Sequence, residues 1–300
     1  MMGPDERDFL RRIAEALERL SPLQRPNGLE RITPGYLWIA PEARLKPIAR
    51  IARIDLDLLR NVDTQREALL DNTARFARGG LANNALLWGA RGTGKSSLVK
   101  AVHAAVSEQA GNGHAPLALV EIQRDDLASL PGLLELLETA ADRRFIILCD
   151  DLSFDTGDAA YKSLKAVLDG GIAGRPDNAI FYATSNRRHL LARDMIENEQ
   201  ATALHAGEAV DEKVSLSDRF GLRLGFHAID QQAYLEMVSS YARHMNIGLD
   251  AGELQRRALD WAMQKGARSG RTAWQFIQSL PEGRQKIVPS TAQTNHAHAK

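Results

Sequence analysis

Residues 83–101 read NNALLWGARGTGKSSLVKA, and within them Gly89–Ser96 match the phosphate-binding pattern G-x-x-x-x-G-K-[ST]. An apolar run at Ala85–Trp88 precedes the loop, and a helical pattern at Ser96–Ala110 follows it. This order of strand, loop and helix is the structural context that the pattern requires. A glycine-rich turn that matched by accident would not be expected between these two elements, so we interpret the stretch as a P-loop.

The residue types in this loop suit the binding of a nucleoside triphosphate. Glycines let the backbone curl so that its N–H groups and the start of the helix point at phosphate oxygens. Lys95 supplies a positive charge at the β- and γ-phosphates, and the hydroxyl of Ser96 can ligate Mg²⁺. We therefore predict ATP and Mg²⁺ as cofactors. The predicted nucleotide contacts in this stretch are Gly89, Ala90, Arg91, Gly92, Thr93, Gly94, Lys95, Ser96 and Ser97.

Further apolar runs, separated by helical segments, continue the pattern that begins at Ala85–Trp88. They are Leu117–Ile122, Phe145–Cys149, Ile180–Thr184 and Leu222–Phe226. Runs of this kind indicate strands that are buried on both faces of a parallel sheet. Three helical segments then follow, near 230–244, 251–265 and 270–280. The sequence predicts an α/β fold: a three-layer parallel-sheet P-loop domain followed by a small α-helical lid domain.

The chain divides into four expected parts. These are an N-terminal helix and linker (1–35), the nucleotide-binding domain (36–228), the helical lid (229–284) and a disordered tail (285–300). Apolar residues at helical spacing predict an amphipathic helix over 6–20, and short apolar runs such as YLWIA (36–40) suggest strands. A further helix is expected from Asp63 to about Arg78, where two glycines end it.

Composition narrows the class of protein. Lys plus Arg and Asp plus Glu both total 38, so the formal charge is zero, which argues against a protein that mainly coats nucleic acid. The single cysteine, Cys149, excludes an intrachain disulfide. No stretch approaches the roughly 20 apolar residues of a membrane span, and the N-terminus has no apolar signal core. We expect a cytoplasmic protein with no membrane contact.

The run FIILCDDL (145–152) places two acids at the end of a buried strand. The carboxyl ends of strands in open α/β sheets form the edge at which ligands bind. Asp150 is therefore predicted to hold Mg²⁺, and Asp151 to orient or deprotonate the attacking water. The alternative is a pair of turn-forming aspartates, which the P-loop nearby makes the weaker reading.

Three later stretches contain polar residues that can face the same site. Asn186 ends the strand IFYATSN (180–186), although a Ser-Asn pair after a strand is usually a turn. In SLSDRFG (215–221), Arg219 has the planar fork suited to a developing phosphate charge, but most arginines are surface residues. In GARSGRTAWQF (266–276), Arg271 falls in the first turn of a helix, where the dipole disfavours a cation. An anionic ligand would relieve that conflict, so Arg271 is a better candidate than Arg268.

In this order, the motifs resemble those of AAA+ ATPases, and more narrowly a bacterial family of predicted AAA+ ATPases, domain-of-unknown-function family 815. The stretches NNALLWGARGTGKSSLVKA, CDDLSFDTGD, YATSNRRHL, SLSDRFGL and RSGR carry the resemblance, which runs from about residue 36 to 280. It implies that Asn186 is the sensor-1 residue, Arg271 the sensor-2 arginine, and Arg219 the arginine finger that acts on the ATP of a neighbouring subunit. It also implies that Asn61 and Val62, in LLRNVD (58–63), line the base pocket.

The sequence departs from the AAA+ pattern in two places. The usual acidic pair is Asp-Glu, so Asp151 is one methylene shorter, which implies slow hydrolysis or a differently placed base. The segment RDDLASLPG (124–132) lacks the aromatic-hydrophobic-glycine loop of threading unfoldases. Switching, loading or remodelling of a partner is therefore favoured over polypeptide threading.

The sequence thus predicts an ATP hydrolase that works as a homo-oligomer, with its site between subunits, to switch or remodel a protein partner. One alternative is a nucleotide switch, or a nucleic-acid-associated loader, with little intrinsic hydrolysis. The neutral charge does not favour the loader. A small-molecule P-loop kinase is the third reading, for which the basic cluster at 187–189 is the nearest candidate for acceptor binding.

Overall fold

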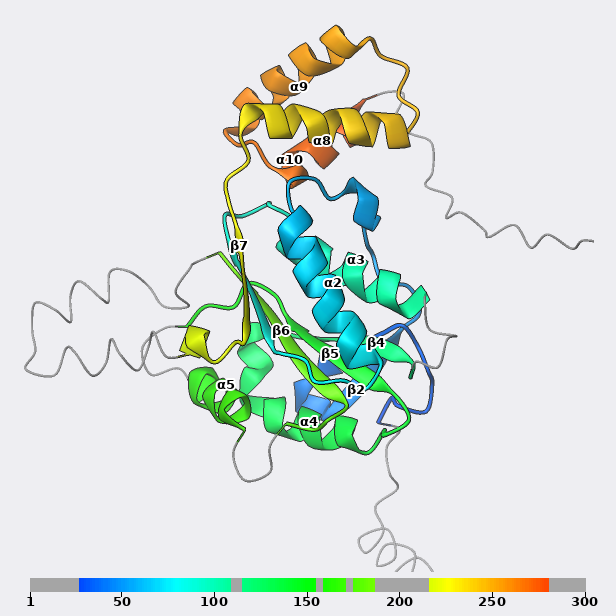
Figure 1. The fold of residues 1–300 in the computed structure, drawn as a ribbon, viewed down its shortest axis with the longest axis vertical. Helices are drawn as coiled ribbons and strands as arrows, with labels where there is room; N and C mark the ends of the chain where they lie inside the picture. The colour runs from blue at the N-terminus through cyan, green and yellow to red at the C-terminus, as the bar shows by residue number, and fades with distance from the viewer. Residues whose placement is uncertain (1–26, 109–114, 155–158, 171–174, 187–215, 281–300) are drawn as a thin grey trace, which may run out of the picture.

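A seven-stranded sheet forms the centre of the molecule (Figure 1). The computed structural model describes residues 27–108, 115–154, 159–170, 175–186 and 216–280. The strands are β1 (Gly35–Ile39), β2 (Arg44–Ile48), β3 (Ala85–Gly89), β4 (Leu117–Ile122), β5 (Arg144–Cys149), β6 (Ala179–Ser185) and β7 (Leu222–Phe226). Their order is β2-β1-β4-β5-β6-β3-β7, and only the β1–β2 pair is antiparallel.

Helices cover both faces of the sheet and so complete three layers. The helices of these layers are α2 (Asp63–Ala77), α3 (Lys95–Glu108), α4 (Leu130–Glu138) and α5 (Ala159–Asp169). Helices α2 and α3 share one hydrophobic cluster with Ile146 and Leu148 of β5. Helices α4 and α5 share the opposite cluster with Phe145 and Ile147. Successive side chains of a strand point to opposite faces, which is why a continuously apolar β5 feeds two cores.

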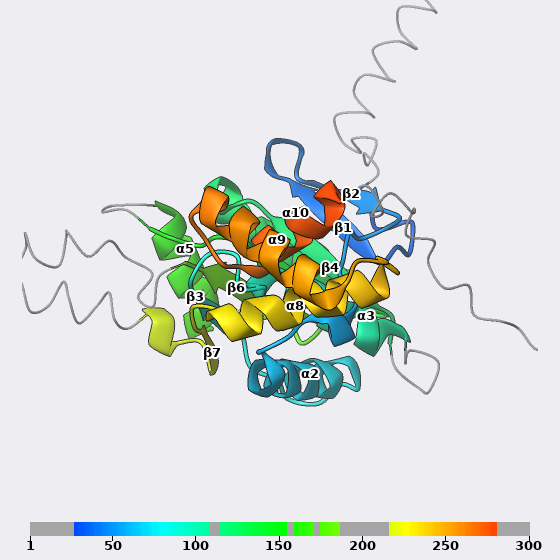
Figure 2. The same ribbon diagram turned by 90° about the horizontal axis from the view of Figure 1, so that it is seen from above.

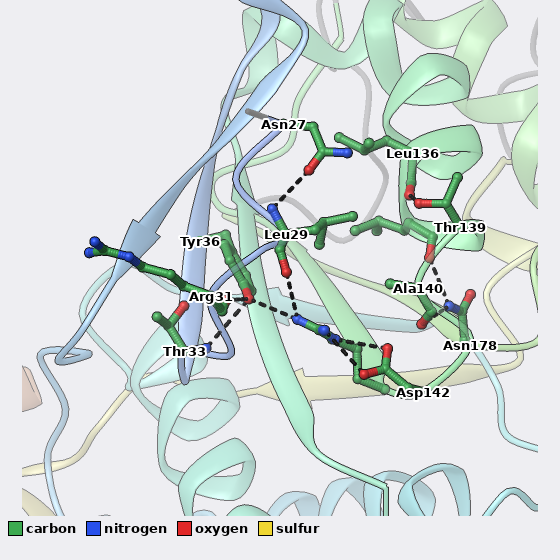
Figure 3. Close-up of polar contacts among 12 residues, drawn as sticks. Asn27, Leu29, Arg31, Thr33, Tyr36, Leu136, Thr139, Ala140, Asp142 and Asn178 are labelled. Atoms are coloured by element: carbon green, nitrogen blue, oxygen red, sulfur yellow. Dashed lines mark hydrogen bonds and ion pairs between the residues drawn. The ribbon is translucent and has the colours of Figure 1, made fainter. Parts of the chain in front are cut away.

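The hairpin β1–β2 extends the sheet beyond β4, and polar contacts fix the chain that leads into it (Figure 3). The buried guanidinium of Arg143 donates to the carbonyl of Leu29 at 3.0 Å and is paired with the carboxylate of Asp142. The hydroxyl of Tyr36 donates to the carbonyl of Arg31 at 2.5 Å. These bonds satisfy backbone carbonyls that the loop would otherwise bury without partners.

A separate helical unit stands over the carboxyl ends of the strands, as the two views show (Figures 1 and 2). It comprises α8 (Gln231–His244), α9 (Ala251–Lys265) and α10 (Gly270–Ser279). Its apolar residues form their own cluster, which includes Tyr234, Tyr241 and Phe276. Each helix begins at a capping side chain that accepts a backbone N–H bond, from Asp230, Asp250 and Ser269 respectively.

Short 3₁₀ helices complete the described elements: η1 (Ala40–Glu42), η2 (Leu56–Leu58) and η3 (Arg124–Ser129). The predicted α/β class, with a parallel P-loop sheet and a C-terminal helical unit, is confirmed. The expected helix at 6–20, the tail at 285–300 and the basic cluster at 187–189 lie outside the described residues. The four-part division of the chain stays a prediction. Within the described part, no helix has the length and apolar character needed to cross a membrane.

Candidate nucleotide-binding site

The loop between β3 and α3 has a backbone that only glycine adopts easily. Gly89, Gly92 and Gly94 have φ angles of 137°, 78° and 95°. A Cβ on Gly89 would lie 1.9 Å from the carbonyl oxygen of Phe226 in β7, so the close strand pairing also excludes a side chain. The hydroxyl of Thr93 donates to the carbonyl of Ala90 at 2.8 Å and ties the loop to itself. The loop therefore has the curled conformation that turns N–H groups toward an anion.

Lys95, the first residue of α3, lies inside this loop. Its Nζ donates to the carbonyls of Gly89 and Ala90, each at 2.8 Å, and to Oδ1 of Asn186 at 3.1 Å. Burial lowers the pKa of the Lys95 ammonium, and the nearby carboxylates of Asp150 and Asp151 oppose that shift. Among the described residues, carbonyl and amide oxygens are the hydrogen-bond partners of this buried ammonium, and a phosphate oxygen can replace one of them.

Asp150 follows β5 and faces the start of α3. Its Oδ1 accepts hydrogen bonds from the hydroxyls of Ser96 and Thr184. A hydroxyl and a carboxylate oxygen in contact are the hard oxygen donors that Mg²⁺ prefers. The residues predicted as metal ligands, Ser96 and Asp150, are thus brought together, and their chemistry fits the ion.

Asp151 lies next to Asp150 with a left-handed backbone, φ 56°. Its backbone N–H donates to the hydroxyl of Thr184 at 3.0 Å, and its carboxylate accepts from the amide of Asn186. Asn186 also accepts from Lys95, so it joins the P-loop lysine to the acid. The two residues predicted to act on the γ-phosphate and the water, Asn186 and Asp151, are in direct contact.

The helical unit closes the site from the opposite side. Gly270, at the start of α10, donates its N–H to the carbonyl of Gly92 in the P-loop at 3.0 Å. Arg271 and Trp274 follow in α10 and line the same cavity as the P-loop, together with Tyr241 of α8. The rings of Tyr241 and Trp274 meet edge to face, with centroids 5.4 Å apart. Arg271 therefore stands where the sequence predicted it, at a helix start that faces the phosphate loop.

The cavity enclosed by these elements has a volume of about 580 Å³. Its lining includes two carboxylates, those of Asp150 and Asp151. It also includes five cationic side chains: Arg53, Arg91, Lys95, Lys100 and Arg271. An excess of positive charge around N–H groups of a P-loop favours a polyanion such as a triphosphate.

The expected base-pocket residues lie beside this cavity. Val62 is buried in the cluster beneath α2 and α3, and Asn61 is exposed with a left-handed φ of 58°. Among the described residues, the cavity lining on this side is provided instead by Ile54 and Leu59, with the stem of Arg53. The assignment of Asn61 and Val62 to the base stays a prediction, and the apolar residues two and seven positions before Asn61 offer the wall that a base requires.

Arg219 does not line the cavity of its own chain in the part that the structure describes. It lies between α5 and β7, where its guanidinium pairs with the carboxylate of Asp169 at the end of α5. The next residue, Phe220, is buried and packs against Phe181 of β6, with ring centroids 6.3 Å apart. Arg219 is thus held beside the end of α5 and is absent from the described lining of the cavity that Lys95 and Arg271 share.

A family model described as "Protein of unknown function (DUF815)" matches residues 32–284, which is most of the chain. The chain belongs to this family. Its parallel P-loop sheet and C-terminal helical unit have the α/β fold class that the sequence predicted. Among curated proteins, none matches the chain.

Several solved structures are similar to the chain at low identity. One is the RuvB Holliday junction branch migration motor of Thermotoga maritima, with 16% identity and a TM-score of 0.42 over 75% of this chain and 71% of that one. Another is the ORC2 protein of Aeropyrum pernix in ADPNP–ADP complexes, with 13% identity and a TM-score of 0.46 over 77% of this chain and 70% of that one. A third comes from the HORMA:CdnC:Trip13 complex of Escherichia coli MS115-1, with 14% identity and a TM-score of 0.48 over 75% of this chain and 90% of that one. These likenesses carry no inference about activity.

The site contains residues that the sequence did not single out. Trp274 and Tyr241 belong to helical patterns whose aromatic positions are typical of a core, and only their contacts show that they reach the cavity. Lys100, one turn after Ser96 on α3, could have been found from helical spacing, because residues four apart share a face. Thr184 belongs to a strand that the sequence predicted. Its bonds to the two acids, however, depend on the pairing of β5 with β6.

Proposed function

We propose that the chain binds Mg·ATP in the cavity between the P-loop and the helical lid and hydrolyses it. The observation that supports this most directly is the convergence of six predicted residues on one cavity. They are Lys95, Ser96, Asp150, Asp151, Asn186 and Arg271. These residues come from the P-loop, two strand ends and the lid, and no single element would bring them together by chance.

Each residue has a task that its position allows. Lys95 and Arg271 approach the phosphates from opposite sides, and the N–H groups around Gly92 and Gly94 bind phosphate oxygens. Ser96 and Asp150 would hold Mg²⁺. A bound magnesium ion supplies charge neutralisation at the β- and γ-phosphates. Asp151 accepts the proton of the attacking water, and the amide of Asn186 orients that carboxylate.

We also propose that the working form is a homo-oligomer in which Arg219 reaches the ATP of the neighbouring subunit. Its pairing with Asp169 and its absence from the described lining of its own cavity support this. An arginine supplied from a second chain stabilises the transition-state charge only when the subunits are assembled. In such an assembly the state of the nucleotide alters the contact between neighbours, which suits the switching or remodelling of a protein partner.

Binding and hydrolysis are best tested separately with the purified full chain. Lys95→Ala should weaken ATP binding, measured by calorimetry, because it removes a phosphate contact. Asp151→Asn should leave ATP binding within a few-fold of wild type but lower phosphate release by about 100-fold or more, the usual effect of losing a general base. Asp125→Asn alters an acid that follows β4 and is not among the cavity residues, so it serves as the matched control.

The outcomes separate the hydrolase from the nucleotide switch. Tight ATP binding by the wild type with no phosphate release at any protein concentration would favour a switch. Hydrolysis that survives unchanged in Asp151→Asn would reject the role given to that carboxylate. A failure to bind ATP at all would overturn the proposal.

A further inference from the structure

The hydroxyl of Thr184 lies between the two acidic residues of the site. Thr184 is on β6 and is 2% exposed, whereas Asp150 and Asp151 are both exposed. Its Oγ1 is 2.5 Å from Oδ1 of Asp150 and 3.0 Å from the backbone nitrogen of Asp151. One buried side chain therefore contacts both of the residues assigned to the metal and to the attacking water.

The direction of each hydrogen bond is fixed by chemistry. An ionised carboxylate only accepts and a backbone N–H only donates, while a hydroxyl has one proton to give. Thr184 must therefore donate to Asp150 and accept from Asp151. Its hydroxyl cannot rotate without losing one of the two bonds, so the group is locked in a single orientation.

The backbone of Thr184 reinforces the same turn. Its carbonyl accepts the N–H of Leu152 at 2.6 Å, directly after Asp151. Asp151 has a left-handed φ of 56°, a conformation that non-glycine residues seldom adopt and that surrounding bonds must maintain. Asn186, which directly follows β6 and is two residues from Thr184, contacts the carboxylate of Asp151. The end of β6 and the residue after it therefore both contact the acids.

We propose that Thr184 is a positioning residue for the metal ligand Asp150 and for the catalytic Asp151. This inference rests on the proposed hydrolysis of Mg·ATP at the same site. Oδ1 of Asp150 accepts from Ser96 and from Thr184 together. The hydroxyl of Thr184 thereby keeps this carboxylate turned toward Ser96, the second residue of the metal site. Thr184 lines the same cavity, and the role proposed for its hydroxyl is exerted through the two aspartates that it contacts.

Two substitutions separate the hydroxyl from the shape of the side chain. Thr184→Val keeps the volume and the preference for a strand but removes the donor and the acceptor. Thr184→Ser keeps the hydroxyl and removes a methyl group. The first measurement is Mn²⁺ binding to the full chain with ADP, followed by electron paramagnetic resonance, which does not depend on turnover. The second is phosphate release as a function of Mg²⁺ and ATP concentration.

We expect Thr184→Val to raise the Mn²⁺ concentration for half-saturation by about 10- to 100-fold, as for other partners of metal ligands. ADP affinity without metal should stay within about two-fold of wild type, because the P-loop contacts remain. The kcat for ATP should fall by about ten-fold or more, with a smaller change in KM. Thr184→Ser should recover both metal binding and kcat to within a few-fold of wild type.

Thr73→Val is the matched control. Thr73 is buried in α2, and its hydroxyl donates to the carbonyl of Leu69 at 2.7 Å and lies 2.8 Å from the hydroxyl of Tyr182. The same substitution there removes equivalent bonds away from the acids, so it should lower the unfolding temperature without moving the Mn²⁺ midpoint. If Thr73→Val weakened Mn²⁺ binding as much as Thr184→Val, the effect would be one of stability and the proposal would fail.

The proposal is also overturned if Thr184→Val keeps the wild-type Mn²⁺ midpoint and kcat, or if Thr184→Ser is equally defective. A wild type that binds Mn²⁺ and ADP but releases no phosphate would reject the proposed hydrolysis alone. In that case the Mn²⁺ midpoints of the two Thr184 variants would still decide whether the hydroxyl positions Asp150.

Discussion

Gly89 occupies the point where β3 ends and the phosphate-binding loop begins. Its φ of 137° is unfavourable for any side chain, and a Cβ would lie 1.9 Å from the carbonyl of Phe226. We predict that Gly89→Ala lowers the free energy of unfolding by more than about 3 kcal/mol, because β3 and β7 must separate to admit the methyl group. The measurement is the urea midpoint of the purified chain, followed by circular dichroism.

Gly266 provides the control for backbone strain without crowding. It ends α9 with a φ of 64°, and a Cβ there would meet nothing within 4 Å. Gly266→Ala should cost only about 1 kcal/mol, the cost of placing a side chain in the left-handed region. Equal losses for the two variants would show that close approach of Phe226 is not what requires glycine at position 89.

His103 is a buried histidine of α3 that titrates differently in the folded and unfolded chain. Its Nε2 donates to the carbonyl of Leu117 at 3.0 Å. Burial and the charge of Arg53 lower the pKa of His103, the bond to Leu117 opposes them, and the resulting pKa is about 4. The unfolded chain, with a histidine pKa of about 6.5, therefore binds more protons between these two values.

We predict that stability is lost as pH falls from about 6.5 toward 4, by about 2 kcal/mol at pH 5. The sign follows from the lowered pKa: the folded state holds His103 neutral, and its contribution is fully present only above the unfolded value. His103→Gln keeps a donor for the Leu117 carbonyl and should flatten this part of the profile, measured as the urea midpoint at pH 5 and pH 8. His227→Gln, at an exposed histidine, should leave the profile as in wild type.

The contact between the lid and the P-loop depends on how α10 begins. The hydroxyl of Ser269 caps the helix by accepting the N–H of Thr272 at 3.0 Å, and the next residue, Gly270, donates to the carbonyl of Gly92. Ser269→Ala should therefore destabilise the first turn of α10 by about 1 kcal/mol. Because Arg271 follows directly, we predict that ATP affinity falls by about five-fold, which corresponds to that free energy.

The lid contains a matched cap that does not touch the loop. Asp250 accepts the N–H of Gly252 at 2.9 Å at the start of α9. Asp250→Ala should cost a similar free energy of unfolding but leave ATP affinity unchanged, as followed by the fluorescence of Trp274, which lines the cavity. If both variants weakened ATP equally, the effect would reflect the stability of the lid and not its contact with Gly92.

Elements with strong local patterns were predicted closely from the sequence. The strands β4 and β7 have the predicted bounds, because Pro116 and Gly221 precede their apolar runs and the polar residues Gln123 and His227 follow them. For the hairpin β1–β2, the sequence only suggested short strands. This segment mixes polar and apolar residues, and contacts distant in sequence, such as the bond from Trp38 to Ser129, help to hold it in place. Local pattern fixes an element, whereas pairing at a sheet edge depends on tertiary contacts.

The candidate site was predicted unevenly for the same physical reason. Lys95, Asp150 and Asp151 belong to contiguous motifs whose strand–loop–helix context is visible in the chain. The position of Trp274 in the cavity requires the lid to fold over the sheet, and no spacing in the sequence encodes that contact. The role of Arg219 rests on resemblance and stays a prediction, because the described lining of its own cavity does not include it.

An arginine finger from a neighbouring subunit acts only when subunits are assembled. The proposed role of Arg219 is therefore tested on the assembled protein. Arg219 is 24% exposed at the side chain and pairs with Asp169, itself 42% exposed. Partly exposed ion pairs contribute little, typically up to about 1 kcal/mol, so a phosphate group of a neighbour can replace the carboxylate. The structure therefore holds Arg219 near the surface in a contact that assembly can exchange.

We predict that the rate of ATP hydrolysis per subunit rises with protein concentration and that Arg219→Ala lowers the plateau by about 100-fold or more. ATP affinity should stay within a few-fold of wild type, because Arg219 is absent from the described lining of its own cavity. Arg223→Ala is the control, since Arg223 lies four residues after Arg219 and forms an exposed ion pair with Asp218. The rate could instead be independent of concentration, or Arg219→Ala could leave it intact. Either result would mean that each subunit completes its own site and that Arg219 is not an arginine finger.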